Sequence, residues 1–245
     1  MKNFFLLFLV AITLIGCSST RTTVNLSPEE HFKYAMELYN DEDYIEAIQE
    51  FQSINLQYPA STVADDAQYY LAESHYKKGE YILGAYEFSR LIKDIPASDF
   101  VPKAQFMLAE SYYQLSPNYQ LDQKYTAKAI EEFQAFIDFF PTDAKVPEAE
   151  QKISELNDKL ARKVYNTAKI YERMEDINAA IYYYNLIIET YHDSKYAPIA
   201  MYEKIKALTI KNDNKSALKE IFTFIERYPG DPNISEIKKL QESLQ

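Results

Sequence analysis

Apolar residues recur at helical spacing along most of the chain, and the same pattern returns at a fixed interval. Residues 71–76 read Leu-Ala-Glu-Ser-His-Tyr, and residues 108–113, 37 positions later, read Leu-Ala-Glu-Ser-Tyr-Tyr. Self-similarity with this period is typical of a two-helix unit stacked several times. The sequence therefore predicts an all-α superhelical array, a fold that offers a long inner surface to other proteins.

Proline punctuates the pattern, because it cannot continue a helix and disfavours helix in the residue before it. We expect five helix pairs. Their second helices close at Tyr58-Pro59, Ile95-Pro96, Phe140-Pro141, Tyr191-His192 and Tyr228-Pro229. The first pair begins at Ser27-Pro28, where serine is a favourable cap and proline suits the first turn.

The intervals between these helix ends are 37, 45, 51 and 37 residues. The extra length of the second and third intervals predicts two irregular features. Residues 116–123 read as an insertion between the helices of the third pair, and residues 146–174 as an unusually long first helix of the fourth. Residues 234–244 read as a helix that caps the last open face. We therefore expect a front half of three pairs at 27–144, and a rear half of two pairs and the cap at 145–245.

Within each pair, three positions resemble the tetratricopeptide repeat: a small residue where the helices cross, an aromatic residue four places later, and a closing proline. They are Ala47, Phe51, Pro59; Gly84, Phe88, Pro96; Ala129, Phe133, Pro141; Ala180, Tyr184, His192; and Ala217, Ile221, Pro229. Small residues in the first helices let the two helices approach closely. These are Ala35, Ala72, Ala109 and Ala168.

The amino terminus reads as an export signal. Residues 1–16 hold one Lys and a short apolar run, too brief to span a bilayer permanently. Leu14-Ile15-Gly16-Cys17 resembles a bacterial lipobox, which implies cleavage between Gly16 and Cys17 and lipidation of Cys17. Cys17 is the only cysteine, so it has no disulfide partner within the chain. We expect residues 17–26 to be a flexible lipidated tether on the outer membrane; the alternative is an ordinary signal peptide with an incidental cysteine.

Charge is distributed unevenly along the chain. The net charge is −11, which argues against a nucleic-acid partner because such proteins need a basic surface. Residues 17–144 carry 9 Lys and Arg against 21 Asp and Glu, whereas residues 145–245 carry 16 of each. The two halves are thus expected to prefer different partners. The alternative is an acidic surface kept for solubility.

Aromatic residues recur at two positions of the first helices, which line the inner side of such arrays. One position holds Phe32, Tyr69, Phe106, Tyr165 and Tyr202; the other, seven residues later, holds Tyr39, Tyr76 and Tyr113. Two turns of helix place them on one face, so we expect two aromatic ladders lining a groove, made acidic by Glu73 and Glu110. The hydroxyl groups favour exposure of the second set. The alternative is that the rings pack neighbouring helices.

No catalytic pattern emerges from the sequence. His31, His75 and His192 fall in separate units without ligand spacing, and four glycines could hardly build a phosphate loop. Paired acids such as Asp65-Asp66 lie at a helix start, where capping explains them. We expect a protein that is not an enzyme and carries no metal or cofactor.

The lipobox, the tether and five repeat-like pairs together resemble the BamD family of outer-membrane barrel-assembly lipoproteins. The likeness is strongest from Ala161-Arg162-Lys163-Val164-Tyr165 through Ala168-Lys169-Ile170-Tyr171 to Ala179-Ala180-Ile181. The resemblance implies a periplasmic scaffold on the outer membrane whose rear half docks on BamA, the barrel insertase, and whose front half receives unfolded barrel proteins; other assembly lipoproteins are further candidate partners.

The candidate rear contacts are Tyr165, Lys169, Arg173 and Tyr183. Tyr183 departs from the family, which commonly carries a basic residue there, and a tyrosine cannot form the salt bridge that a basic residue would make. A different class, a periplasmic repeat lipoprotein that coordinates cell-wall or division enzymes, is the alternative function.

Overall fold

The computed structural model describes residues 26–245 and contains only helices and connections within that range. The predicted signal peptide, Cys17 and nearly all of the tether lie outside the described residues. The helices are α2 (Pro28–Asn40), α3 (Tyr44–Gln57), α4 (Ala64–Lys77), α5 (Tyr81–Asp94), α6 (Val101–Leu115), α7 (Lys124–Phe139), α8 (Val146–Arg173), α9 (Ile177–Thr190), α10 (Tyr196–Ile210), α11 (Asn214–Arg227) and α12 (Ile234–Leu244).

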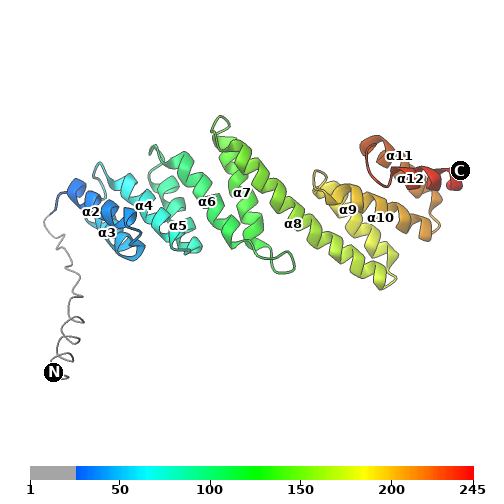
Figure 1. Cartoon of the computed structure of the whole chain (residues 1–245), viewed down its shortest axis with the longest axis horizontal. Coiled ribbons are helices and arrows are strands. Elements are labelled where there is room, and N and C mark those ends of the chain that lie inside the picture. The colour runs from blue at the N-terminus through cyan, green and yellow to red at the C-terminus, as the bar shows by residue number, and fades with distance from the viewer. Residues whose placement is uncertain (1–25) are drawn as a thin grey trace, which may run out of the picture.

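The helices form an extended row in chain order, with α2 at one end and α12 at the other (Figure 1). Each helix packs mainly on its sequence neighbours, as expected for a repeat array. The all-α array of helix pairs predicted from the sequence is confirmed. Helix α8 runs obliquely through the middle of the row and separates α2–α7 from α9–α12 (Figure 1).

Helix ends fall where the sequence places them. Helices α3, α5, α7 and α11 stop two residues before a proline, and α9 stops at the corresponding turn although no proline follows. The connection 116–123 lies between α6 and α7, and α8 has 28 residues. The capping helix α12 has the bounds that its apolar pattern predicts.

The turns inside the pairs share one backbone feature. Glu42, Gly79, Glu175 and Asn212 have φ values of 63°, 82°, 62° and 60°, each at the turn that follows a first helix. Only glycine adopts this left-handed conformation without a steric cost, so three units keep a mildly strained residue there. The third pair has the 116–123 connection in place of this turn.

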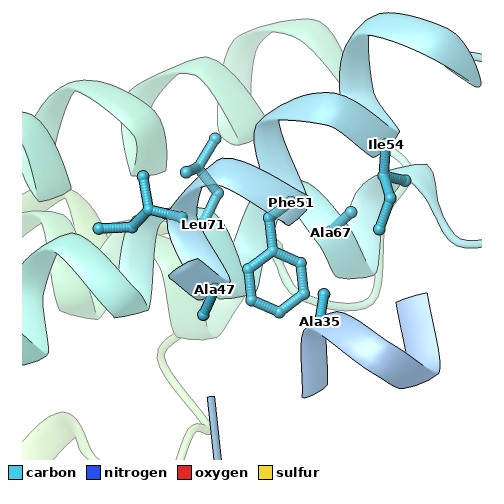
Figure 2. Packing of buried hydrophobic residues seen from close by; sticks show 7 residues of the cluster. Ala35, Ala47, Phe51, Ile54, Ala67 and Leu71 are labelled. Carbon is cyan, nitrogen blue, oxygen red and sulfur yellow. The ribbon is translucent and has the colours of Figure 1, made fainter. Parts of the chain in front are cut away.

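Each pair builds a core together with the first helix of the next pair. Phe51 of α3 is fully buried and lies between Ala35 of α2 and Leu71 of α4, as Figure 2 shows. Ala47 and Ala67 are also fully buried beside it, and their small side chains let the helix backbones approach. This arrangement fixes the stacking of one unit on the next.

Helix α8 contributes to two cores. Its first half places Ala149 and Leu156 against Phe133 and other aromatic residues of the third pair. Its second half places Ala161 and Ala168 in a separate core with residues of α9 and α10. The boundary predicted at 144/145 thus falls at the start of a helix that packs on both sides.

Candidate functional site

Tyrosine hydroxyls on the first helices donate hydrogen bonds to glutamates of the following unit. The Tyr113 hydroxyl lies 2.8 Å from Glu155 Oε2, and the Tyr76 hydroxyl lies 3.4 Å from Glu110 Oε1. Near the carboxyl terminus the Tyr202 hydroxyl lies 2.8 Å from an oxygen of Glu236 on α12. Each of these bonds joins a first helix to a helix of the next unit. The three tyrosines therefore stabilise the stacking of the units, independently of any binding role.

The environment of these hydroxyls makes them reluctant to ionise. Burial raises the pKa of Tyr113 to about 12, aided by the hydrogen bond to Glu155 and the nearby carboxylate charges. Burial likewise raises the pKa of Tyr76 to about 12, with the Glu110 charge as the next cause. The pKa of Tyr39 is also raised, first by burial and then by Glu73. Tyr76 and Tyr113 therefore remain neutral hydrogen-bond donors well above neutral pH.

Lysines from the following helices cover the aromatic faces and neutralise the acids between them. Lys152 of α8 lies 4.1 Å from the ring centre of Tyr113 and 2.9 Å from Glu110 Oε2. Lys103 of α6 lies 4.4 Å from the ring centre of Tyr69, in the same geometry of cation over ring. The rings and acids expected to line the groove therefore have lysines beside them, where the sequence suggested an acidic lining.

Two of the aromatic residues expected to line the groove are buried. Tyr69 is 0 % exposed and Phe106 is 2 % exposed. Tyr69 stacks on Phe100 at 4.6 Å between ring centres, and Phe106 contacts two phenylalanines of α7 at 5.4 and 5.6 Å. Neither residue lines an open groove, which corrects that expectation: the first ladder belongs to the core in these units because neighbouring rings cover it.

The remaining groove residues are partly buried and not freely exposed. They are Phe32, Tyr39, Tyr76, Tyr113 and Glu73, with Tyr165 and Tyr202 in the rear half. Glu110 is buried. Tyr39 packs edge-on to Tyr44 and Tyr70, which shows why its exposure is limited. The packing alternative therefore holds for part of each of these rings, and each side chain remains partly exposed.

The four rear-half candidates have different neighbours. Tyr165 lies 5.6 Å from the Tyr196 ring on α10, and Lys169 pairs with Glu172 and, at 3.7 Å, with Glu203. These two face α10. Arg173 lies one turn after Lys169 on α8 and lines a cavity of about 340 Å³ beside the 116–123 connection. Tyr183 lies on α9.

Tyr183 stacks on Tyr171 of α8, with 5.2 Å between ring centres and 11° between planes. Three exposed apolar side chains border this stack in the sequence: Ile170, Met174 and Tyr182. Tyr182 also contacts Tyr183 at 5.3 Å. We call Ile170, Tyr171, Met174, Tyr182 and Tyr183 the rear apolar cluster. The sequence reading missed Tyr182, although its position before Tyr183 on the outer side of a helix could have indicated it.

A polar cavity of about 510 Å³ lies where the two halves meet, and we call it the junction pocket. It is formed by the start of the 116–123 connection, the middle of α8 and the start of α10. Its lining residues are Ser116, Pro117, Asn118, Tyr119, Glu155, Asp158, Lys159, Arg162, Lys195 and Tyr196. The sequence marked 116–123 only as an insertion, and nothing in it indicated that these three segments meet.

Among residues 26–245, no group of three or more His, Cys, Asp or Glu side chains could hold a metal ion. No helix in the same range is long and apolar enough to cross a membrane. His31 is fully buried, and its Nε2 lies 2.5 Å from Glu50 Oε2. This pair links α2 to α3, so the histidine has a structural explanation.

The family model for YfiO, described as an outer membrane lipoprotein, matches residues 25–212. The chain belongs to this family. Membership in the YfiO family agrees with the BamD-like resemblance of the sequence, and it suggests a role in outer membrane assembly. The YfiO match covers α2–α10, and therefore both cores that α8 connects.

Solved repeat proteins resemble the chain more distantly. One of them is the solved complex of the TPR2AB domain of yeast Sti1 with pHSP90, whose matching chain is 16 % identical to this chain. The match covers 89 % of this chain and 98 % of that chain, with a TM-score of 0.41. The thermophilic TPR protein TTC0263 of Thermus thermophilus is 14 % identical, with the same coverages and a TM-score of 0.38. No curated protein matches the sequence.

Proposed function

We propose that this protein is a non-enzymatic scaffold of the outer-membrane barrel-assembly machinery. On the periplasmic side of the outer membrane, it binds the periplasmic domains of a BamA-like barrel insertase and receives incoming unfolded barrel proteins. The observation that carries the proposal is the match to an outer membrane lipoprotein family along helices α2–α10. A stacked array of helix pairs suits this task because it presents extended surfaces to several polypeptides at once.

The rear apolar cluster is our candidate docking surface for the insertase. Ile170 is 46 % exposed and Tyr182 is 62 % exposed, although both are apolar or aromatic. Large side chains of this kind, held on rigid helices, are typical anchors of protein interfaces. Since Tyr183 occupies the place of a basic residue, this dock depends on ring and aliphatic contacts more than on an ion pair.

The inner face of the front half is our candidate surface for client segments. Tyr39, Tyr76 and Tyr113 present partly exposed side chains there, beside lysines and glutamates. Such a surface suits extended segments that combine aromatic and polar residues, because aromatic side chains give contact area at a modest ordering cost. The net negative charge of residues 17–144 disfavours strongly acidic segments.

Lipidation of Cys17 supplies the membrane anchor in this proposal. Several acyl chains on one cysteine would hold the protein firmly, whereas a single chain binds only marginally. The Cys17→Ser variant is expected to leave the membrane fraction and appear in the soluble periplasmic extract. Retention of this variant in outer-membrane vesicles after a salt wash would contradict lipid anchoring.

Affinity purification of the full-length protein through a carboxyl-terminal tag tests the central claim. We expect an insertase of the barrel-assembly type to be recovered from mildly solubilised membranes, and depletion of the protein to lower the amounts of outer-membrane barrels. Recovery of cell-wall synthesis or division enzymes without the insertase would favour the alternative function. An unchanged set of barrel proteins after depletion would also contradict the proposal.

A further inference from the structure

The junction pocket contains three cations and two carboxylates, and most of them already have partners. Asp158 pairs with Lys195, whose Nζ lies 3.0 Å from Oδ2. Glu155 accepts the Tyr113 hydroxyl and an amide hydrogen of Gln151. These contacts satisfy both acids of the pocket.

The remaining cations are used differently. Lys159 Nζ lies 2.8 Å from Ser116 Oγ, so it holds the start of the 116–123 connection. Arg162 lies with its guanidinium carbon 4.2 Å from the ring centre of Tyr119. Among the described residues, the ion pairs of arginine are those of Arg90 with Glu87 and Asp94, and Arg162 forms none. Arg162 is therefore a cation that lies over a ring and has no ion-pair partner within residues 26–245.

The stack orients the guanidinium and leaves its edge available. An arginine presents several N–H donors in one plane, which match the two oxygens of a carboxylate. Stacking on Tyr119 restricts the side chain beforehand, so less conformational entropy is lost when an anion binds. Lys195 is close enough to Arg162 for the two positive charges to interact. The hydrogen bond to Asp158 raises the pKa of the Lys195 ammonium group, and the Arg162 charge opposes that rise.

We propose that the junction pocket binds a carboxylate side chain of an extended polypeptide, with Arg162 as the ion partner and Tyr119 and Tyr196 against the neighbouring residues. The cavity of about 510 Å³ is large enough for a few residues and is open to solvent. This site goes beyond the proposed assembly function, and its occupant is an extended polypeptide segment that carries an acidic side chain.

The charges of the pocket favour a carboxylate over a phosphate. Glu155 and Asp158 line the same cavity, so three cations against two acids leave a single net positive charge. One charge balances a carboxylate, whereas a phosphate near two negative charges would meet additional repulsion. The same balance distinguishes the pocket from a basic patch for lipid phosphates, which needs several uncompensated cations.

Matched peptides test the site on the full-length protein in detergent. The probe is a fluorescein-labelled, amidated peptide of serine and threonine with a central Tyr-Glu-Phe; the comparison peptides carry Gln or phosphoserine in place of Glu. We expect the Glu peptide to bind about tenfold more tightly than the Gln peptide, as a charge-assisted pair would give. In Arg162→Gln this ratio should fall to about one.

Two control variants separate binding from loop anchoring. Lys163 donates to the Leu121 carbonyl oxygen at 2.6 Å, so Lys163→Gln loosens the same connection without removing the proposed ion partner. Arg227 also lies over a tyrosine, at 5.8 Å from the Tyr228 ring, but on α11, so Arg227→Gln removes a similar stack outside the pocket. Both controls should keep the Glu preference.

Three results would overturn the proposal. One is equal binding of the Glu and Gln peptides, or no binding of either, by the wild-type protein. Another is an unchanged ratio in Arg162→Gln. The third is tighter binding of the phosphoserine peptide, which would assign the pocket to phosphate groups instead.

Discussion

The Tyr113 hydroxyl on α6 donates a 2.8 Å hydrogen bond to Glu155 Oε2 on α8. The two residues are 42 positions apart in the chain, so this bond joins the third helix pair to the long helix that follows. Comparable bonds connect Tyr76 to Glu110 and Tyr202 to Glu236. Inter-unit tyrosine–glutamate bonds are thus a recurrent means of fixing one unit on the next.

Removal of the Tyr113 hydroxyl should lower stability slightly. We expect Tyr113→Phe to reduce the free energy of unfolding by about 1 kcal/mol, because one hydrogen bond is lost and Glu155 can still be solvated. Urea denaturation followed by circular dichroism measures the change. Tyr86→Phe is the control, since Tyr86 is exposed on α5 and should show no change. Equal effects of both substitutions would exclude a special role for the bond.

Alkaline pH should destabilise the array through the same tyrosines. The pKa values of Tyr76, Tyr113 and Tyr202 are raised to about 12, so the folded protein holds these protons more tightly than the unfolded chain, whose tyrosines titrate near 10. The stabilisation is complete below pH about 10 and is lost as pH rises from there towards 12. Urea midpoints measured across this range should fall, and they should fall less in the variant with Phe at all three positions. A midpoint independent of pH would contradict the raised pKa values.

Gly84 lies where the two helices of the second pair approach closely. A methyl group there would lie 3.3 Å from both the Ala72 carbonyl oxygen and the Tyr76 backbone nitrogen. Since these are backbone atoms that cannot move independently, we expect Gly84→Ala to lower the free energy of unfolding by about 1 kcal/mol, despite the better helix propensity of alanine. Thermal denaturation measures it. Gly230→Ala is the control, because the added methyl group there meets open space and causes no overpacking. If Gly84→Ala were more stable than the wild-type protein, the two helices would have to separate easily.

The rear apolar cluster should affect partner binding without affecting folding. Ile170→Asp combined with Tyr182→Asp places charges on exposed positions, so the unfolding midpoint should change little while recovery of the insertase falls about tenfold or more. The readout is the amount of insertase recovered per tagged protein. Phe139→Asp is the matched control, because Phe139 is 74 % exposed but lies at the end of α7 in the front half. If both variants recovered equal amounts of insertase, the insertase would have to bind at a different surface.

Local signals explain why the helix boundaries were predictable from the sequence. Proline after Tyr58, Ile95, Phe140 and Tyr228 stops a helix wherever it occurs, so these ends do not depend on tertiary structure. The long α8 and the capping helix were predictable for a related reason, since an apolar stripe at helical spacing continues through each.

The candidate groove depends on contacts that the repeat pattern does not contain. Tyr69 and Tyr76 both recur at regular positions, yet only Tyr69 is fully buried, because Phe88 and Phe100 close over it. Lys103 and Lys152 reach the rings from later helices, and their positions depend on how the units stack. The junction pocket likewise requires segments near residues 119, 162 and 196 to meet. Such distant encounters are set by the superhelix and not by local sequence.

The double membership of α8 determines how the two ends of the molecule can move. A helix of 28 residues is about 40 Å long at the usual rise per residue. Because it is anchored in one core by Leu156 and in the next by Ala168, no hinge of loose chain separates the halves. Two polypeptides bound at opposite ends would be kept at a constant distance and orientation, as by a rigid strut, and a push on one would be transmitted to the other.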